Sequence, residues 1–138
     1  MWKKLYIESY NFSLKSSKRE EFIQITENVN NLIKEAQADE GLVKIFIPHT
    51  TAAITINQNA NPDVARDIIT ILGEHIPKKR MLNVEGNSDA HFKSSLFGVF
   101  LEIPFENGKM SLGEWQGVYF CEFDGPRTRT VRIQVWSL

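Results

Sequence analysis

The segment from Glu85 to His91 concentrates groups that could do chemistry. Two carboxylates (Glu85 and Asp89), an amide (Asn87) and an imidazole (His91) lie within seven residues. The chain has three histidines, and a second one, His49, lies in a Pro-His-Thr-Thr stretch between two apolar segments. Imidazole and carboxylate groups bind metals and can also position anions. If the fold brings His49 and His91 together, the sequence predicts a metal or anion site.

Each histidine also has a structural interpretation. His49 could be a turn residue satisfied by a neighbouring threonine, or it could be a metal ligand or general acid/base held where a strand bulges. His91 could belong to the first turn of a short helix, and Asp89 could orient its imidazole by a hydrogen bond. The third histidine, His75, continues the apolar stripe of a predicted helix, and we expect it to be structural.

The bulk composition narrows the class of protein. A length of 138 residues predicts a single domain, residues 1–138, with its own core. Sixteen Lys and Arg against seventeen Asp and Glu give a net charge of -1. Affinity for nucleic acids grows with the number of phosphates that a protein neutralises, so a chain this close to neutrality is a poor general binder. We therefore expect no nucleic-acid partner.

The absence of targeting segments and the cysteine content exclude further classes of protein. No apolar stretch approaches the ~20 residues that span a bilayer, so no membrane partner is expected. The start of the chain has no uninterrupted apolar segment typical of a signal peptide. The single cysteine, Cys121, excludes an intrachain disulfide and lies in an apolar run, where a buried thiol is expected. The default expectation is a cytoplasmic protein.

Hydrophobic periodicity predicts strands and helices in a mixed order. Strands are expected over residues 2–14, 22–25, 42–47, 52–56, 99–105, 109–112, 118–123 and 128–136. Helices are expected over 27–37 with Thr26 as N-cap, from Asn61 onward, and as a short third helix over 90–97 that ends at Gly98. The second helix should bury a stripe made of Val64, Ile68, Ile71 and Leu72. This order predicts an α+β fold with mainly antiparallel sheets.

Several other polar residues are candidates for a site. Glu122 shares a strand face with apolar side chains, so its carboxylate needs a partner, and Arg127 or Arg129 could supply one as catalytic machinery or as a structural salt bridge. Asn57 and Asp63 are explained about as well by loop structure and helix capping as by ligand binding. Trp115, between two glycines, could anchor a loop or form a flat wall for an aromatic ligand.

Three segments together resemble the YjbQ family. Residues 49–64 closely resemble its first signature, residues 85–93 its second and residues 113–127 its third, and the likeness spans nearly the whole chain. The resemblance implies an α+β fold that assembles as a homotrimer, with sheets around the threefold axis and a pocket built from the signature segments. The family name, secondary thiamine-phosphate synthase, implies an activity on small phosphorylated molecules.

Residue by residue, the resemblance places family positions on this chain. His49 and His91 fall on the histidine positions, Asn57, Asp63 and Asn87 on polar positions, and Gln116 and Glu122 on the third motif. Family members often carry a histidine where this chain has Asn83. Zinc prefers three or four ligands, so Asn83 weakens a zinc interpretation, whereas magnesium tolerates amide, carboxylate and water oxygens and binds through substrate phosphates.

The leading hypothesis is an enzyme that condenses a pyrimidine pyrophosphate with a thiazole phosphate, with a divalent metal (magnesium or zinc) assisting release of pyrophosphate. The alternatives are a small-ligand or metal-binding protein without turnover, and a purely structural trimer. The expected catalytic residues are His49, His91 and Glu122. The expected metal ligands are His49, His91, Glu85 and Asp89. The expected ligand-binding residues are Thr50, Asn57, Asp63, Asn87, Lys93, Trp115, Gln116 and Arg127.

Overall fold

The chain folds into two antiparallel sheets and three helices. The structure is a computed structural model that describes residues 3–138, and the counts here refer to that range. The five-stranded sheet has the order β1-β8-β3-β5-β6, and the three-stranded sheet has the order β2-β7-β4. The elements are β1 (Tyr6–Lys15), β2 (Glu21–Gln24), α1 (Thr26–Glu35), β3 (Gly41–Phe46), β4 (Ala52–Gln58), α2 (Pro62–His75), α3 (Ser88–Phe97), β5 (Phe100–Glu106), β6 (Lys109–Met110), β7 (Gln116–Glu122) and β8 (Thr128–Ser137). The α+β prediction is confirmed.

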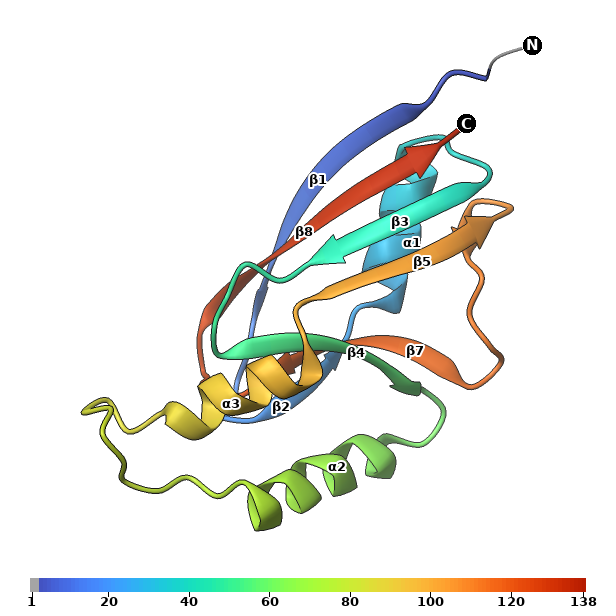
Figure 1. Ribbon diagram of the computed structural model, residues 1–138. Helices are drawn as coiled ribbons and strands as arrows, with labels where there is room; N and C mark the ends of the chain where they lie inside the picture. The colour runs from blue at the N-terminus through green and yellow to red at the C-terminus, as the bar shows by residue number, and fades with distance from the viewer. Residues whose placement is uncertain (1–2) are drawn as a thin grey trace.

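The main core lies between the inner face of the large sheet, α1 and the small sheet. Val131, Ile133 and Val135 of β8 alternate with exposed residues and are buried, as the period of two predicts. Val29 and Ile33 of α1 pack against them and are fully buried, together with strand residues from both sheets. In Figure 1, α1 lies behind the large sheet, which curves away from the small one.

The second face of the small sheet is covered by α3. Ala90 of this helix is buried with Cys121 and Phe123 of the β7 end, and the ring of Phe97 packs edge-on against Phe123 with centroids 5.4 Å apart. The hydroxyl of Ser94 donates to the carbonyl oxygen of Ala52 at 2.6 Å, which fastens α3 to β4. The predicted end of this helix at Gly98 is confirmed, since Gly98 is its C-cap with φ of 92°.

Helix α2 begins as predicted but packs differently. Asn61 is its N-cap, and the side chain accepts from the backbone N–H of Asp63 at 2.9 Å. The predicted buried stripe is wrong within this chain: no residue of α2 is buried, and Ile71 is 52% exposed. The physical reason is that α3 already covers the small sheet, so α2 stands outside it, as Figure 1 shows. Only Leu72 reaches the second hydrophobic cluster from this helix.

Three further predictions need correction or completion. Thr26 is the first helical residue rather than the N-cap; its hydroxyl accepts from the N–H of Val118 at 2.9 Å. The opening strand starts at Tyr6, and Trp2, which was included in it, lies outside the described residues. The strands expected over 118–123 and 128–136 form as β7 and β8, but they do not pair with each other because they belong to different sheets. Within residues 3–138, no helix has the length and apolarity to cross a membrane.

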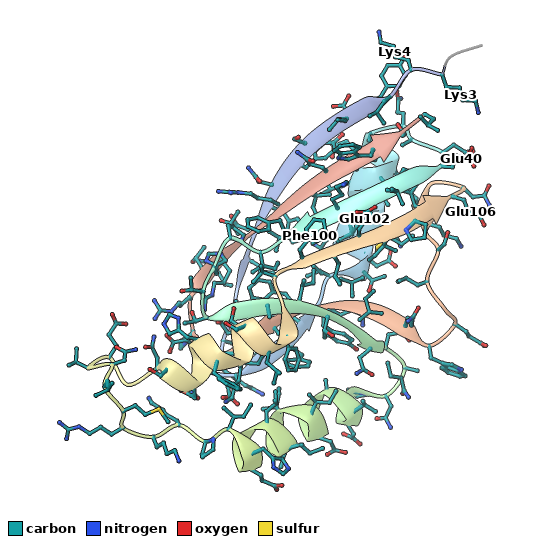
Figure 2. All side chains as sticks on the ribbon, viewed as in Figure 1. Lys3, Lys4, Glu40, Phe100, Glu102 and Glu106 are labelled. Carbon is teal, nitrogen blue, oxygen red and sulfur yellow. The ribbon has the colours of Figure 1, made fainter. Side chains whose placement is uncertain are left out.

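Within residues 3–138, no other helix or strand covers the outer face of the large sheet. Phe100 is 51% exposed there, and Figure 2 shows Phe100 and Glu102 on the side of β5 that no helix covers. Lys44 of β3 lies with its ammonium 4.3 Å from the ring centroid of Trp136, which keeps this tryptophan half-buried.

Candidate functional site

A polar hollow of about 430 Å³ lies where three chain segments meet. These segments are the β3–β4 connection, the stretch before and into α3, and the turn from β7 into β8. The hollow brings His49 and His91 together with groups from the Glu85–His91 stretch. Its lining residues are Pro48, His49, Thr50, Thr51, Glu85, Asn87, His91, Asp124, Arg127 and Arg129.

The local sequence explains why these segments leave the sheets here. The ladder between β3 and β5 ends at Phe46, and Pro48 has no N–H with which to continue it. On the opposite wall, Gly125 allows the β7–β8 turn to pass close to the chain after β1. A Cβ at Gly125 would lie 2.3 Å from the carbonyl oxygen of Lys18, and the N–H of Gly125 donates to the carbonyl of Arg19 at 2.9 Å.

The floor of the hollow is a buried ion pair between Arg129 and Glu122. Glu122 is fully buried, and Nε of Arg129 donates to its two oxygens at 2.9 and 3.1 Å. The hydroxyl of Ser16 donates to the same carboxylate at 2.6 Å. Burial by itself raises the pKa of Glu122, but the hydrogen bonds from Arg129 and Ser16 outweigh burial and lower it. Glu122 therefore holds Arg129 and is not a free acid or base, contrary to its predicted catalytic role.

One edge of the Arg129 guanidinium remains free. A guanidinium has five N–H donors, and those of Nε and Nη2 are directed to Glu122 and Thr51, including a bond of 2.9 Å from Nη2 to the Thr51 hydroxyl. Nη1 makes no hydrogen bond to any residue in the range 3–138, yet it is not sealed from solvent. Arg129 lines the hollow and is 5% exposed, so its free edge faces the hollow. The hydrogen bonds to Glu122 and Thr51 hold the guanidinium in this position.

His49 is held by the backbone of β8. Its Nε2 accepts a hydrogen bond from the N–H of Thr130 at 3.0 Å. Burial lowers the pKa of His49, and the positive charge of Arg129 lowers it further. Because Nε2 is already occupied, the predicted role of His49 as a metal ligand or general acid/base could involve only Nδ1.

The rim of the hollow is organised by Asp124. Its Oδ2 accepts from Nδ2 of Asn87 at 2.8 Å and from Nη2 of Arg127 at 3.0 Å. Burial raises the pKa of Asp124, while the bonds from Asn87 and Arg127 lower it, and the net change is downward. Asn83, at the position where family members often carry histidine, donates to Oδ1 of Asn87 at 2.7 Å. It continues the same chain of hydrogen bonds.

Asp89 and Lys93 point away from the hollow. Asp89 accepts from Nη2 of Arg19 at 2.9 Å and from Nζ of Lys93 at 3.2 Å, and Lys93 also donates to Glu20 at 2.6 Å. Lys93 is 1% exposed and Asp89 is buried. The structure therefore does not place Asp89, predicted as a metal ligand, or Lys93, predicted as a phosphate contact, in the hollow. Helical periodicity turns both side chains toward the β1–β2 connection, one turn apart on α3.

Four other predicted ligand-binding residues lie at the far end of the small sheet. Antiparallel pairing places the end of β4 beside the start of β7, about 20 Å along the strand from the hollow. There the side chain of Gln116 accepts from the N–H of Gly113 at 2.8 Å, and Trp115 is 61% exposed. None of the four lines the hollow; they are Asn57, Asp63, Trp115 and Gln116.

A resident metal does not fit this arrangement. Within residues 3–138, no three His, Cys, Asp or Glu side chains lie close enough together to hold a metal ion. Of the four predicted ligands, His49 is occupied at Nε2 and Asp89 is paired with Arg19 and Lys93. The remaining two, His91 and Glu85, are exposed, and zinc prefers three or four ligands.

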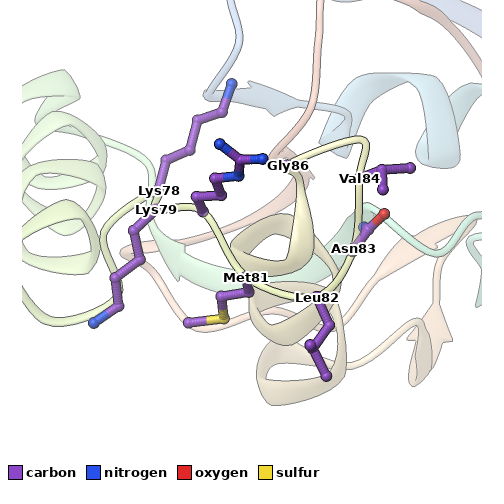
Figure 3. Close-up of a pocket in the computed structure, with 8 residues that line it drawn as sticks. Lys78, Lys79, Met81, Leu82, Asn83, Val84 and Gly86 are labelled. Carbon is purple, nitrogen blue, oxygen red and sulfur yellow. The ribbon is translucent and has the colours of Figure 1, made fainter.

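A second hollow, larger in volume than the polar one, has a different character. It encloses about 630 Å³ and is formed by the segment of residues 78–86 alone, as the close-up in Figure 3 shows. Leu82 and Val84 of this segment are fully exposed. A single surface segment lines it, and its three basic side chains, Lys78, Lys79 and Arg80, are all exposed. In the polar hollow, by contrast, Arg129 is buried and held by Glu122, so we assign the site to the polar hollow.

Two residues important to the polar hollow were not predicted as part of it. Arg129 was considered only as a partner of Glu122, and that pairing is confirmed. Asp124 was not among the candidate site residues. The signal that could have identified Asp124 is the arginine three residues later, since Asp124 and Arg127 pair across the turn.

Sequence comparisons place the chain among uncharacterised relatives. A family model described as UPF0047 protein YjbQ-like matches residues 10–137. YugU of Bacillus subtilis is 48% identical over 88% of this chain and 94% of its own length. A UPF0047 protein of Methanocaldococcus jannaschii is 46% identical over 91% of this chain and 92% of its own length.

Solved structures agree with the fold. The crystal structure of an uncharacterised YjbQ/UPF0047 protein from Clostridium acetobutylicum is 50% identical and covers 90% of this chain and 97% of its own, with a TM-score of 0.87. A YbjQ-like protein of unknown function from Sulfolobus solfataricus, at 24% identity, covers 98% of this chain and 100% of its own with a TM-score of 0.91, and supports the fold alone. The chain belongs to the UPF0047 YjbQ-like protein family.

Proposed function

We propose that the polar hollow binds a small phosphorylated molecule and that the chain is a transferase of the secondary thiamine-phosphate synthase type. Its reaction would join a pyrimidine pyrophosphate to a thiazole phosphate. The observation that carries this proposal is the free Nη1 edge of Arg129, which a buried carboxylate holds at the floor of the hollow. Guanidinium N–H groups that are held in a fixed position can donate hydrogen bonds to the oxygens of a phosphate group.

The size and lining of the hollow support a small polar ligand. A volume of about 430 Å³ lies within the range of sites that hold small molecules. Its donors are the Arg129 edge, the rim guanidinium of Arg127 and the imidazole of His49. Arg127 is half-exposed, so it could move to meet a ligand while Arg129 stays fixed.

The chemistry of the condensation fits the residues present. The bond between the pyrimidine methylene carbon and the pyrophosphate oxygen breaks, and the leaving group takes the electron pair. The thiazole nitrogen supplies the electron pair of the new C–N bond, so no proton has to be removed. Stabilising the leaving pyrophosphate is the main demand, and Arg127 and Arg129 can meet it. Neither the paired Glu122 nor the occupied Nε2 of His49 is needed as a base.

Charge balance indicates the form in which pyrophosphate would bind. Two guanidinium groups (Arg127 and Arg129) face three carboxylates at or beneath the hollow (Glu85, Asp124 and Glu122). With His49 neutral, the local charge is close to -1, so a free polyanion should bind more weakly than its magnesium complex. We therefore expect the substrate to be the magnesium complex of the pyrophosphate, which reduces this repulsion.

Purified protein should be incubated with both phosphorylated halves and magnesium, and thiamine phosphate measured. Wild-type protein is expected to form product, and Arg127→Gln to form it at least tenfold more slowly. Arg66→Gln changes an exposed arginine on α2, outside the hollow, and is the matched control with unchanged activity. If high enzyme concentrations form no more product than heat-killed protein, the proposed reaction is wrong.

A second candidate is a small-ligand-binding protein without turnover. It is favoured by one observation: two of the three predicted catalytic residues, His49 and Glu122, are engaged in structural hydrogen bonds. Pyrophosphate that raises the melting temperature of wild-type protein, without any condensation product, would support this candidate over the transferase.

We further propose that the protein forms a homotrimer in the cytoplasm. The trimer is supported by apolar side chains that this chain leaves exposed. Leu82 and Val84 are fully exposed, and no apolar residue of α2 is buried. Closed cyclic assembly buries such surface without forming filaments, and the family resemblance selects threefold symmetry. Sedimentation equilibrium should return about three chain masses, and a clean monomer at micromolar concentration would contradict the trimer.

A further inference from the structure

The imidazole of His49 takes the place of a missing strand beside β8. The β3–β8 ladder ends where Phe46 pairs with Arg132, and β8 continues beyond that point to Thr128. Continuing the ladder would place Pro48 opposite Thr130, but the chain has already turned away. The N–H of Thr130 therefore has no strand partner on this side, and Nε2 of His49 accepts its hydrogen bond at 3.0 Å.

This contact determines which ring nitrogen carries the proton. A backbone N–H can donate to Nε2 only while that nitrogen has a free lone pair, so Nε2 carries no proton. The single proton of a neutral imidazole then lies on Nδ1. Nδ1 has no hydrogen-bond partner among residues 3–138, and His49 lines the hollow, which makes Nδ1–H a donor available to a ligand.

The charged groups around His49 oppose a second proton. Arg129 and Arg132 both lie near the ring and disfavour a positive charge, and burial acts in the same direction to lower the pKa of His49. Glu122 acts in the opposite direction, but Arg129 already neutralises it. The other charged or titratable groups lining the hollow are Glu85, His91, Asp124 and Arg127.

A second fixed donor lies in the same hollow. Nη1 of Arg129 makes no hydrogen bond within residues 3–138, whereas its Nε and Nη2 are anchored on Glu122 and Thr51. Arg129 follows Thr128 at the start of β8, and the next residue, Thr130, anchors His49. The two donors are therefore positioned by adjacent residues of one strand. Fixed donors cost little ordering entropy when a ligand binds.

We propose that the Nδ1–H of His49 and the Nη1 edge of Arg129 form an oxyanion subsite that receives a phosphate oxygen of the ligand. The proposal rests on the proposed function only in taking the ligand to be a phosphate. His49 is then a ligand-binding donor locked in one tautomer, rather than a general base. A subsite with donors alone accepts oxyanions and rejects cationic N–H groups, which have no lone pair with which to accept.

The tautomer can be tested without any ligand. Nitrogen-15 labelled protein should be studied by long-range 1H–15N correlation of the histidine side chains between pH 7 and 8. His49 is expected to show a protonated Nδ1 and an unprotonated Nε2 across this range. An Nε2–H tautomer, or a ring that gains a second proton within the range, would overturn the proposal. This result does not depend on any catalytic activity.

The donor role is tested by phosphate binding in two contrasting variants. In His49→Asn the amide nitrogen can occupy the position of Nδ1, so the donor to the ligand is kept. In His49→Gln the amide oxygen can reach the position of Nε2 and accept from Thr130, but the donor at Nδ1 is lost. Calorimetric titration with inorganic phosphate should give His49→Asn an affinity within about threefold of wild type, and His49→Gln one at least about tenfold weaker.

Other outcomes separate the two proposals. Melting temperatures close to wild type in both variants show that they are folded when titrated. Equal losses in both variants, wild-type affinity in both, or a wild-type protein that does not bind millimolar phosphate would each overturn the subsite. If phosphate binding follows the expected pattern but no thiamine phosphate is formed, the subsite stands and only the proposed reaction fails.

Discussion

The carboxylate of Glu122 binds the guanidinium of Arg129 from one side, so the ion pair fixes the arginine without using all its donors. Nε of Arg129 lies 2.9 Å from the nearer Glu122 oxygen, and Nη1 is left facing the hollow. Both residues are almost completely buried. A free arginine at the surface would lose rotamer entropy on binding a phosphate, whereas this one has already lost it during folding.

Glu122→Gln should strongly destabilise the fold. The variant keeps the size of the side chain but leaves the buried guanidinium of Arg129 without a counter-charge. Removing one partner of a buried pair typically costs about 3–5 kcal/mol. Urea denaturation at pH 7 should show a fall of this order in the free energy of unfolding. The matched control is Glu102→Gln, because Glu102 forms an exposed pair with Lys44 at 3.4 Å and should change stability by about 0–1 kcal/mol. Equal effects in the two variants would disprove the structural role of Glu122.

Acid should destabilise the protein through its paired carboxylates. Hydrogen bonds and opposite charges outweigh burial and lower the pKa of Glu122, Asp89 and Asp124 in the folded state. Each contribution is therefore fully present above the unfolded-state pKa, about 4.5 for Glu122 and 3.8 for the two aspartates, and is lost as the pH falls through the lower folded-state value. Urea midpoints at pH 7, 5, 4 and 3 should fall below pH 5, with a shallower fall in Glu122→Gln. A constant midpoint between pH 5 and pH 3 would contradict this prediction.

Asp124→Ala should impair ligand binding more than folding. The variant releases Asn87 and the guanidinium of Arg127 from their shared acceptor, so both lose their positions at the rim. We expect pyrophosphate affinity, measured by calorimetry, to fall about tenfold. The free energy of unfolding should fall by only about 1–2 kcal/mol. Asp63→Ala removes a similar pair with an arginine three residues later, Arg66, and should leave affinity unchanged. Unchanged affinity in Asp124→Ala would show that the rim does not bind the ligand.

Lys93→Met should destabilise the protein without changing ligand affinity. The ammonium of Lys93 lies between Glu20 and Asp89, at 2.6 and 3.2 Å, and is 1% exposed. Its removal leaves buried carboxylate charge less compensated, which should cost about 3 kcal/mol in urea denaturation. Titration with pyrophosphate at a temperature where the variant is folded should give the wild-type affinity. A large loss of affinity would contradict this prediction and indicate that Lys93 takes part in ligand binding.

The parts of the fold that the sequence predicted well are those determined by local chemistry. Asn61, where the second helix was expected to begin, is the N-cap of α2 through one side-chain hydrogen bond. The strands expected over 99–105 and 109–112 form as β5 and β6, which pair across a turn whose residues, Asn107 and Gly108, tolerate positive φ. Two of the three polar segments of the hollow, the one around His49 and the one from Glu85 to His91, were also identified, since the residues of each are adjacent in sequence. Long-range pairing was not accessible in this way. The division of β7 and β8 between two sheets depends on contacts across the whole chain.

The same distinction applies to the site. Asp89 and Lys93 have the residue types of a binding site, but their direction depends on how α3 is rotated against the small sheet. Gln116 belongs to a site-like motif, yet antiparallel register places it at the opposite end of β7 from Glu122. Arg129 was considered only as a salt-bridge partner because its free edge exists only once Glu122 and Thr51 have bound its other donors.

The most direct measurement is the crystal structure of the protein soaked with magnesium and pyrophosphate. We predict difference density for a pyrophosphate in the polar hollow, with one phosphate oxygen within hydrogen-bond distance of both Nδ1 of His49 and Nη1 of Arg129. Density only at another surface, or an empty hollow in crystals soaked at millimolar pyrophosphate, would contradict the assignment of this hollow as the functional site.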